Sequence, residues 1–287
     1  MKTYSYKHPK VLSLINAIPE AAGKAKAMNL PYWILAQKSH PFGVVIVGQE
    51  PQQLTAPRGT PIALVALEPS QASSENLSDF ISTATKLVTE KNLANALVTL
   101  SFKHRRAVMQ FQQAGFEPFD DYYLMYRELS QHWTPTIGLQ FKPIKLRETR
   151  EWFMVATRYL AGTADTALNH GLQYMLDLPD TFLTRYHASE KLYFVVRGET
   201  TIGVLDIHGT NGWIGNMAVN PLSRRQGYGK QILTFALNQL KTRGCSQAGL
   251  RVHVNNKPAC QLYDSFGFKK TARFKRLLWW NPTYAAS

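Results

Sequence analysis

The chain has 287 residues, of which 45% are hydrophobic and 18% charged, as in a globular protein long enough for two domains. No stretch approaches the roughly 18 apolar residues of a membrane helix, and the N-terminal region lacks the apolar segment of a signal peptide. We therefore expect a cytoplasmic protein without membrane contact. Cys245 and Cys260 have no metal-ligand spacing and are expected to be reduced thiols.

The formal net charge of +14 is unevenly distributed along the chain. Residues 1–135 contain 13 Lys and Arg against 10 Asp and Glu, whereas residues 136–287 contain 20 against 9. The second half therefore favours an anionic partner, such as a phosphorylated cofactor or an acidic substrate. A solvated basic face without a partner is the alternative. No aromatic RNA-binding motif is visible, so we do not expect nucleic acid as the partner.

Apolar patterning separates the two halves of the chain. Residues 96–100 have the apolar pattern of a strand, and a later apolar run ends near Leu129. Polar residues follow it, which is typical of a connection between domains. We therefore expect two domains, at residues 1–132 and 133–287.

The second half alternates between helix and strand patterns, which indicates an α/β fold. Trp279 and Trp280, at the end of the chain, are expected to be core or domain-interface aromatics, and a wall of a substrate pocket is the alternative. In chain order, the sequence predicts a helix over 152–168, strands over 192–198, 200–209 and 213–221, a helix from Gly229 that ends at Gly244, a strand over 248–254, a helix over 258–268 and a strand over 273–280.

The first half repeats the pattern of the second half at an offset of 152 residues. Ala66 then lies over Ala218 and Phe116 over Phe268, and no gap is needed in between. This predicts an internal duplication. The two copies differ at positions that could bind a ligand or take part in a reaction. Gly227 aligns with Glu75, Gly229 with Leu77, Asn256 with His104, and Tyr263 with Phe111.

A glycine-containing loop, SRRQGYGKQ, occupies residues 223–231 directly before the long helix. Its glycines let backbone N–H groups approach a ligand closely. The first N–H groups of the helix are unpaired and lie at the positive end of its dipole, which favours a phosphate group. Arg224, Arg225 and Lys230 add positive charge. An ordinary turn with a solvated basic rim is the alternative.

Two familiar phosphate-binding loops do not fit, because Ile232 and Gln231 stand where the dinucleotide fingerprint and the P-loop need other residues. The order of strand, loop, helix, strand and helix instead resembles the GNAT superfamily of acyl-CoA-dependent N-acyltransferases, over about residues 193–274. The family's pyrophosphate loop, Q/R-x-x-G-x-G/A, and its second motif are matched by Arg224, Gly227 and Gly229, and by Asn256, Ala259, Leu262, Tyr263, Gly267 and Phe268.

The resemblance implies a fold of two GNAT-like domains, the first of them degenerate. Each would be a mixed, mostly antiparallel, twisted sheet flanked by helices. It implies that the second domain transfers an acetyl group from acetyl-CoA to a primary amine by direct attack, without a metal. The residues expected to hold the cofactor are Met217, Ala218, Val219, Arg224, Arg225, Gln226, Gly227, Tyr228, Gly229, Lys230, Asn256, Ala259 and Tyr263.

The resemblance also assigns catalytic roles. The backbone N–H of Met217 would face the thioester carbonyl. The phenol of Tyr263 would protonate the leaving thiolate. A general base is not evident, because Trp213 and Gly215 stand near the positions where many relatives carry Glu or His.

Three residues remain as candidates for the base: Asp206, His208 and His253. Of these, Asp206 is the one we assign, and the alternative is that no base is needed because the amine arrives neutral. The acceptor is expected to be the amine of a small molecule or a peptide, and the charge of the second half suggests an acceptor that carries acid groups. The alternative function is a non-catalytic module that binds acyl-CoA or presents its basic surface to a partner.

Overall fold

The computed structural model describes residues 1–8, 30–37, 40–50, 55–67, 73–130, 132–134, 138–172, 177–208 and 211–285. The chain divides into two compact units, each of which is described by itself. Unit 1 comprises Met1–Asp121 and Arg273–Ser287, and unit 2 comprises Tyr122–Ala272. In the described part of the chain, no helix is long and apolar enough to cross a membrane. Cys245 and Cys260 are both free thiols.

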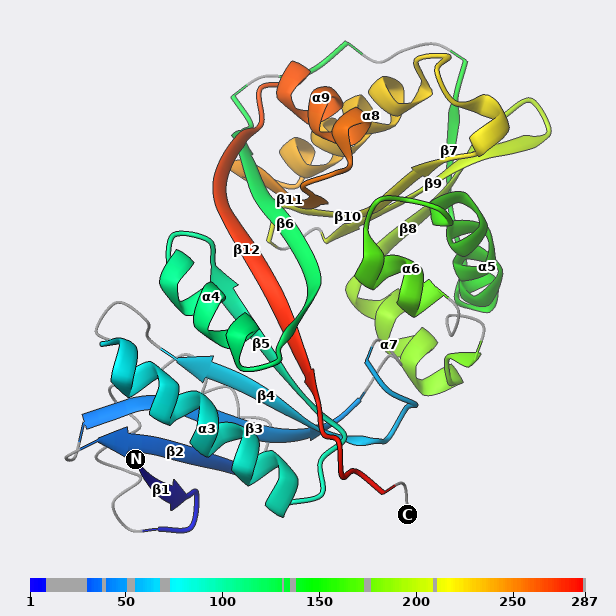
Figure 1. The fold of residues 1–287 in the computed structure, drawn as a ribbon. Helices are drawn as coiled ribbons and strands as arrows, with labels where there is room; N and C mark the ends of the chain where they lie inside the picture. Colours follow the sequence, from blue (N-terminus) through cyan, green and yellow to red (C-terminus); the bar gives the residue numbers. More distant parts are fainter. Residues whose placement is uncertain are drawn as a thin grey trace. The chain divides into compact units, whose positions relative to one another are not determined.

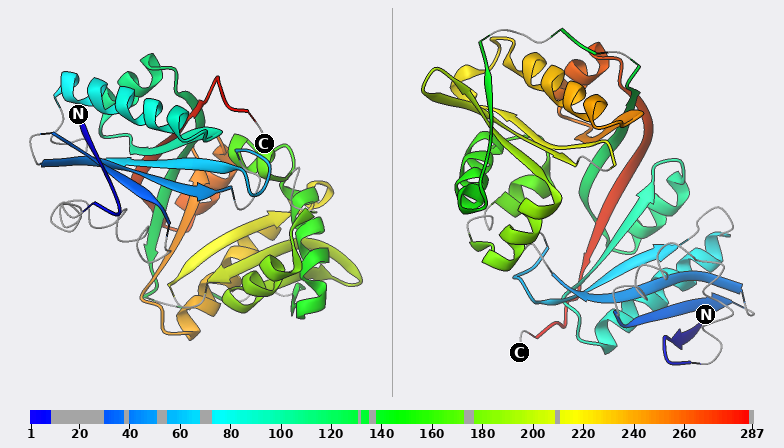
Figure 2. Two further views of the ribbon diagram at one scale, coloured as in Figure 1. Left: turned by 90° about the horizontal axis from the view of Figure 1, so that it is seen from below. Right: turned by 180° about the vertical axis from the view of Figure 1, so that it is seen from behind.

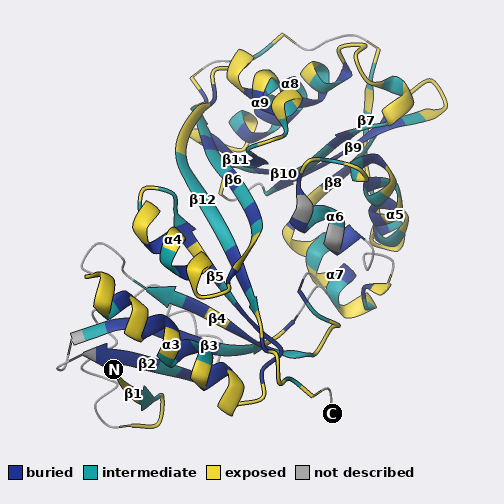
Figure 3. Ribbon diagram, in the orientation of Figure 1, coloured by how far each residue is buried: buried dark blue, intermediate teal, exposed yellow. Residues whose placement is uncertain are grey.

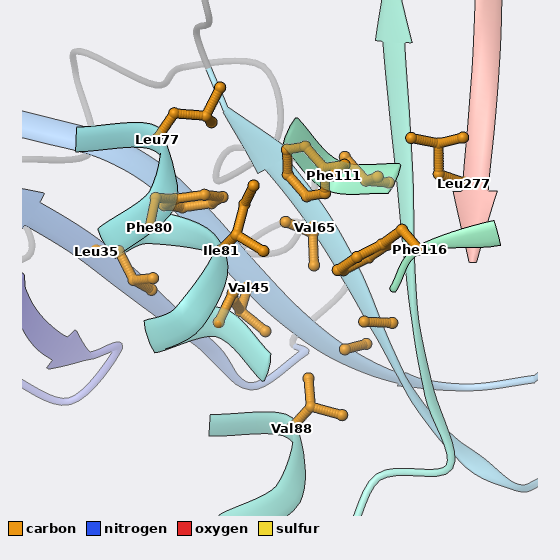
Figure 4. Packing of buried hydrophobic residues seen from close by; sticks show 14 of the residues in the cluster. Leu35, Val45, Val65, Leu77, Phe80, Ile81, Val88, Phe111, Phe116 and Leu277 are labelled. Atoms are coloured by element: carbon orange, nitrogen blue, oxygen red, sulfur yellow. The ribbon is translucent and has the colours of Figure 1, made fainter. Parts of the chain in front are cut away.

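Unit 1 is a sheet with helices α3 and α4 packed against it (Figure 1). The strand order is β1-β2-β3-β4-β5-β12, with β4 and β5 parallel and the other neighbours antiparallel. Phe80 of α3 and Phe111 of α4 join Val45 and Val65 of the sheet in one apolar cluster (Figure 4). The elements are β1 (Lys2–Ser5), β2 (Tyr32–Gln37), β3 (His40–Gln49), β4 (Pro61–Leu67), α3 (Ser74–Glu90), β5 (Asn95–Ser101), α4 (Arg105–Gln113) and β12 (Lys269–Trp280).

Unit 2 is a sheet with helices on both faces, α8 and α9 on one side and α5 to α7 on the other (Figures 1 and 2). The strand order is β6-β11-β10-β9-β8-β7, and only the pair β10 and β11 is parallel. The elements are β6 (Glu117–Glu128), β7 (Gln140–Pro143), η2 (Leu146–Glu148), α5 (Thr149–Leu160), α6 (Thr166–Leu172), α7 (Asp180–Ser189), β8 (Lys191–Arg197), β9 (Thr200–His208), β10 (Trp213–Val219), η4 (Pro221–Ser223), α8 (Tyr228–Thr242), β11 (Gln247–His253) and α9 (Lys257–Ser265).

The helix α8 shows how the sequence pattern produces this layering. Its buried residues include Ile232, Leu233, Ala236, Leu237 and Leu240, which recur at helical spacing and pack on the sheet. The helices carry exposed residues on their outer faces, whereas the central strands are largely buried (Figure 3). The sheet of unit 2 is therefore a rigid support for the loops at the ends of its strands.

The structure confirms the internal duplication and the mixed α/β fold. At the offset of 152 residues, β4, β5, α4 and β6 coincide residue for residue with β10, β11, α9 and β12. The helix ends also correspond, because Gly115 and Gly267 both follow their helix with a positive φ, of 87° and 78°. The sequence repeat is thus a repeat of structure.

The last strand of each copy bonds to the other copy. The strand β6 ends the first copy but pairs with β11 of unit 2 from Glu128 to Tyr122. The strand β12 ends the second copy but pairs with β5 of unit 1 from Phe274 to Trp280. Unit 1 is therefore not contiguous in sequence. The division into domains 1–132 and 133–287 describes the two copies of the repeat and stays a prediction.

The single helix predicted over 152–168 is wrong, because the chain breaks between α5 and α6. Gly162 adopts a φ of 72°, and its N–H donates to Asn169 Oδ1 at 3.1 Å. Asp165 Oδ1 then accepts from the N–H of Leu168 at 2.8 Å, which caps the new helix. Local polar contacts therefore outweigh the helical periodicity here.

Candidate active site

The loop between β10 and α8 presents a row of backbone donors. Arg225 and Gly227 adopt positive φ values of 63° and 82°, and Gly227 is the N-cap of α8. Among the described residues, no acceptor pairs with the backbone N–H groups of residues 225–229, whereas the N–H of Lys230 already bonds to the oxygen of Gly227. Successive free N–H groups at a helix N-terminus form an anion-binding site.

The arginine of the loop pattern has a structural partner. Arg224 Nε donates to the carbonyl of Val219 at 3.3 Å, and Arg224 Nη2 donates to the carbonyl of Tyr159 at 2.7 Å. These bonds tie the loop to the end of α5, so the side chain is held and is not the free charge expected from the sequence. Arg225 and Lys230 are exposed and remain available to an anion.

A cavity of about 650 Å³ opens beside this loop, which is a size typical of cofactor sites. Its lining unites the loop, the end of β10 and the first turns of α9. Of the residues predicted to hold the cofactor, all but Gln226 line it: Met217, Ala218, Val219, Arg224, Arg225, Gly227, Tyr228, Gly229, Lys230, Asn256, Ala259 and Tyr263.

The cavity lies where β10 and β11 stop pairing. The two strands are in parallel register only at Trp213 and Ile214 of β10. Beyond them, Met217 and Val219 line the cavity from β10, and Asn256 lines it from the segment after β11. Asn256 Oδ1 also accepts from the N–H of Ala259 at 3.3 Å, which caps α9. In the first copy, His104 makes no such bond.

Tyr263 lies between this cavity and a second one. It projects from α9, is 8% exposed and packs on Phe268 with ring centroids 5.8 Å apart. No described residue hydrogen-bonds its hydroxyl. Burial raises the pKa of the Tyr263 phenol above its ordinary value. The hydroxyl is therefore protonated at neutral pH and available to a ligand.

The second cavity, of about 400 Å³, adjoins the first. The residues common to the two linings are Leu160, Thr163, Met217, Asn256, Ala259 and Tyr263. The polar residues of the second lining include Asp165, Tyr186, His208, Asn216, Arg251 and His253. A ligand of the first cavity and a ligand of the second can therefore meet at Met217 and Tyr263.

A buried polar cluster lies behind the second cavity. His208 Nδ1 is 2.6 Å from Glu190 Oε1, and the Glu190 side chain is only 4% exposed. One oxygen or nitrogen atom from each of Glu190, Asp206 and His208 lies within 4.8 Å of the others. Burial and the neighbouring Asp206 raise the pKa of Glu190 to about 7, and burial lowers the pKa of His208.

The three candidate bases occupy different positions. Asp206 is fully buried and lines neither cavity. His253 lines the second cavity, but its Nδ1 accepts from the N–H of Asn255 at 3.2 Å. His208 lines the same cavity and has its Nδ1 on Glu190. The assignment of Asp206 as the base stays a prediction.

The two tryptophans near the end of the chain lie away from the cavities. Trp279 packs on Phe116 in unit 1, and Trp280 is 47% exposed. Neither tryptophan lines either cavity. Glu190 and Tyr186 were not singled out from the sequence, because nothing in their local pattern marks them. Tyr186 lies on α7 and Glu190 caps its end, so only the packing of this helix against β9 brings them to Asp206 and His208.

Comparisons with known proteins agree with this geometry. Residues 147–268 match the model of the acetyltransferase (GNAT) family. A segment of 55 residues is 47% identical to a [ribosomal protein bS18]-alanine N-acetyltransferase of Haemophilus ducreyi, over 19% of this chain and 38% of the relative. A segment of 68 residues is 38% identical to GCN5-related N-acetyltransferase 6, chloroplastic, of Arabidopsis thaliana, over 23% of this chain and 24% of the relative. The chain thus spans less than two fifths of the length of these relatives.

Two solved structures share the fold over most of the chain. A GCN5-related N-acetyltransferase from Sphaerobacter thermophilus aligns over 99% of this chain and 98% of its own, with a TM-score of 0.65 and 13% identity. A tandem GNAT protein from the clavulanic acid biosynthesis pathway aligns over 90% of this chain and 84% of its own, with a TM-score of 0.57 and 13% identity. The chain therefore has a tandem GNAT fold, and residues 147–268 form a domain of the acetyltransferase (GNAT) family.

Proposed function

We propose that unit 2 transfers an acetyl group from acetyl-CoA to a primary amine. The observation that carries this proposal is the junction of two cavities at Met217 and Tyr263, one of them beside the row of free N–H groups. The larger cavity suits a long ligand with an anionic end, and the smaller one suits the amine. The proposal gives the first copy no cofactor role, since it lacks the glycines, the asparagine and the tyrosine.

The donor set fits the anionic end of acetyl-CoA. The N–H groups of residues 225–229 and the exposed Arg225 and Lys230 would hold its pyrophosphate. The backbone of Met217 and Val219 would orient the arm that leads to the acetyl group, and the N–H of Met217 would donate to the carbonyl oxygen. When bound, acetyl-CoA supplies a thioester whose carbon accepts the amine and whose sulfur leaves as a thiolate.

Two side chains would move the protons. Tyr263 would give the proton of its hydroxyl to the sulfur, since it is protonated, buried and shared by both cavities. His208 would take a proton from the amine at Nε2, because its Nδ1 is directed at Glu190. His208 lies three residues along β9 from Leu205, which faces Met217. That is about 10 Å of strand, a gap that one water molecule and the acceptor can span.

The proposal is tested by release of CoA from acetyl-CoA in the presence of a panel of amines. The panel includes an alanine-initiated peptide, because several relatives, that of Haemophilus ducreyi among them, are named as [ribosomal protein bS18]-alanine N-acetyltransferases. It also includes acidic small amines, because the second half of the chain is basic. Amine-dependent release is the expected result. Tight binding of acetyl-CoA without release to any amine would instead favour a binding module.

We expect Gly227→Val to weaken acetyl-CoA binding about 100-fold, since the left-handed backbone would be lost together with one or two hydrogen bonds worth about 1.5–3 kcal/mol each. A Cβ added at Gly227 would meet no atom within 4 Å, so the main penalty comes from its φ of 82°. Calorimetric titration measures the affinity.

Gly198→Val is the matched control for this substitution. Gly198 has a φ of 60°, has equally open surroundings and lies in the turn between β8 and β9. Both variants should lose about 1–2 kcal/mol of stability from backbone strain. Only Gly227→Val should weaken acetyl-CoA binding, and equal affinities of the two variants would contradict the assignment of the loop.

A further inference from the structure

The strand β10 carries an irregularity beside the cavities. Ile214 faces Ile207 on β9, and Met217 faces Leu205. Two residues of β10, Gly215 and Asn216, therefore stand opposite the single residue Asp206. This is a β-bulge, a feature that bends a strand and redirects the residues after it.

The side chain of Asp206 fills the space that the bulge creates. Asn216 Nδ2 donates to Asp206 Oδ2 at 2.7 Å, and the Tyr186 hydroxyl donates to the same atom at 2.9 Å. The other oxygen lies against Gly215, where an added Cβ would come within 1.7 Å of Asp206 Oδ1. The carboxyl is fully buried, so no water competes for these contacts. Only glycine fits opposite this carboxyl.

The first copy provides an internal comparison without a bulge. The strands β3 and β4 pair in continuous register from Gly43 to Gln49. Ala63 and Leu64 stand there in place of Gly215 and Asn216, and they face Val47 and Ile46. The bulge therefore occurs in the copy that has the buried carboxyl, the glycine and the asparagine, and not in the copy with apolar residues.

We propose that Asp206 is a positioning residue that locks the bulge of β10, and that the bulge directs Met217 toward the junction of the two cavities. The inference rests on the proposed function for its effect on turnover, but the lock itself is a property of the fold. It replaces the role of base that the sequence suggests for Asp206.

The two roles of Asp206 predict opposite results for one substitution. Asp206→Asn keeps the size of the side chain and an oxygen that can accept from Asn216 and Tyr186. Burial also raises the pKa of the Asp206 carboxyl, so the loss of its charge matters less than it would at the surface. A positioning residue therefore retains kcat within about 5-fold in this variant, whereas a general base loses about 100-fold or more.

Asp206→Val removes the hydrogen-bonding atoms and should release the bulge. We expect its kcat to fall about 100-fold while the KM for the amine changes little, because a misdirected Met217 N–H stabilises the reacting carbonyl less. Asp264→Asn, which alters only an exposed pair with Lys270, is the control for a lost carboxylate. Loss of turnover in Asp206→Asn, or retention in Asp206→Val, would overturn the proposal.

Nuclear magnetic resonance tests whether Asp206 holds the bulge, and it needs no amine substrate. The backbone amide resonance of Met217 should shift in Asp206→Val and stay near its wild-type position in Asp206→Asn. Equal shifts in the two variants would overturn the proposal even if both enzymes were active. If the wild type turns over no amine, the proposed function fails, and the amide comparison still decides whether Asp206 holds the bulge.

Gly215→Ala tests the same contact through stability. We expect a large loss of stability in the single variant, because every atom within 3.0 Å of the added Cβ belongs to Asp206. Combination with Asp206→Ala should restore part of the loss, so that the two effects are not additive. Thermal unfolding measures this coupling. Additive losses would mean that the two residues do not act on each other and would contradict the lock.

Discussion

Replacement of Tyr263 by phenylalanine is expected to lower kcat about 100-fold, the scale typical of a lost general acid, with little change in folding or in affinity for acetyl-CoA. No described residue bonds to the hydroxyl, so its removal leaves no protein donor or acceptor unpaired. The first copy shows that phenylalanine fits this position. Phe111 occupies it fully buried, 4.9 Å from the ring of Phe116 (Figure 4).

The measurement is kcat with saturating acetyl-CoA, together with calorimetry of the variant. Tyr193→Phe is the control, since Tyr193 is also buried and lines neither cavity. If Tyr263→Phe turned over at the wild-type rate at every pH, Tyr263 would not be the acid. A fall in acetyl-CoA affinity without a fall in kcat would assign it to binding alone.

The second large effect is expected at His208 and depends on pH. Glu190 and His208 share a proton below about pH 7, since the pKa of Glu190 is raised to about 7 and that of His208 is lowered. A pair that already holds this proton cannot take another from the amine. The rate should therefore rise as the pH passes through about 7, and His208→Gln should lower kcat about 100-fold above that pH.

The variant Glu190→Gln distinguishes this rise of the rate with pH, the acidic limb of the pH–rate profile, from the ionisation of the amine itself. Without the carboxylate, the buried imidazole titrates at lower pH, so the limb should move to lower pH while the maximal rate falls. The ionisation of a free amine does not change with the enzyme variant. An unchanged limb in Glu190→Gln would contradict the pairing of these residues. Other titratable groups face the cavity or the pair and are the same in both enzymes: Asp165, Tyr186, Asp206, Arg251 and His253.

His187→Gln is the matched control for the substitution at His208. His187 lies on α7 with its Nε2 3.2 Å from the carbonyl of Ile144, and it lines neither cavity. Its replacement should leave the pH profile unchanged. If His208→Gln behaves in the same way, the amine loses its proton by another route.

Local features of the site could be predicted from the sequence. Gly227 and Asn256 act within a few residues of their own positions, one through its φ and the other as a helix cap. The duplication could also be predicted, because a fixed offset preserves the apolar pattern of every element. Most strands and helices of the second half followed for the same reason, but the polar break after α5 and the helix α7 were not predicted.

Features that depend on long-range packing could not be predicted. Glu190 meets His208 only after β8 and β9 have paired, and Asp206 meets Gly215 only because β10 is bulged. The guanidinium of Arg224 bonds to Tyr159, which is 65 positions away in the chain. The sequence of β6 and β12 does not show that β6 pairs with β11 and β12 with β5. Either partner strand would fit the same alternation of buried and exposed side chains.

The most direct test of this account is calorimetric titration of the full chain with acetyl-CoA. We predict saturation at one molecule per chain in the wild type and binding about 100-fold weaker in Gly227→Val. Binding of two molecules would contradict the assignment of the first copy as unable to hold the cofactor. Absence of binding to the wild type would contradict the central claim, because the row of free N–H groups in the loop would then serve some other anion.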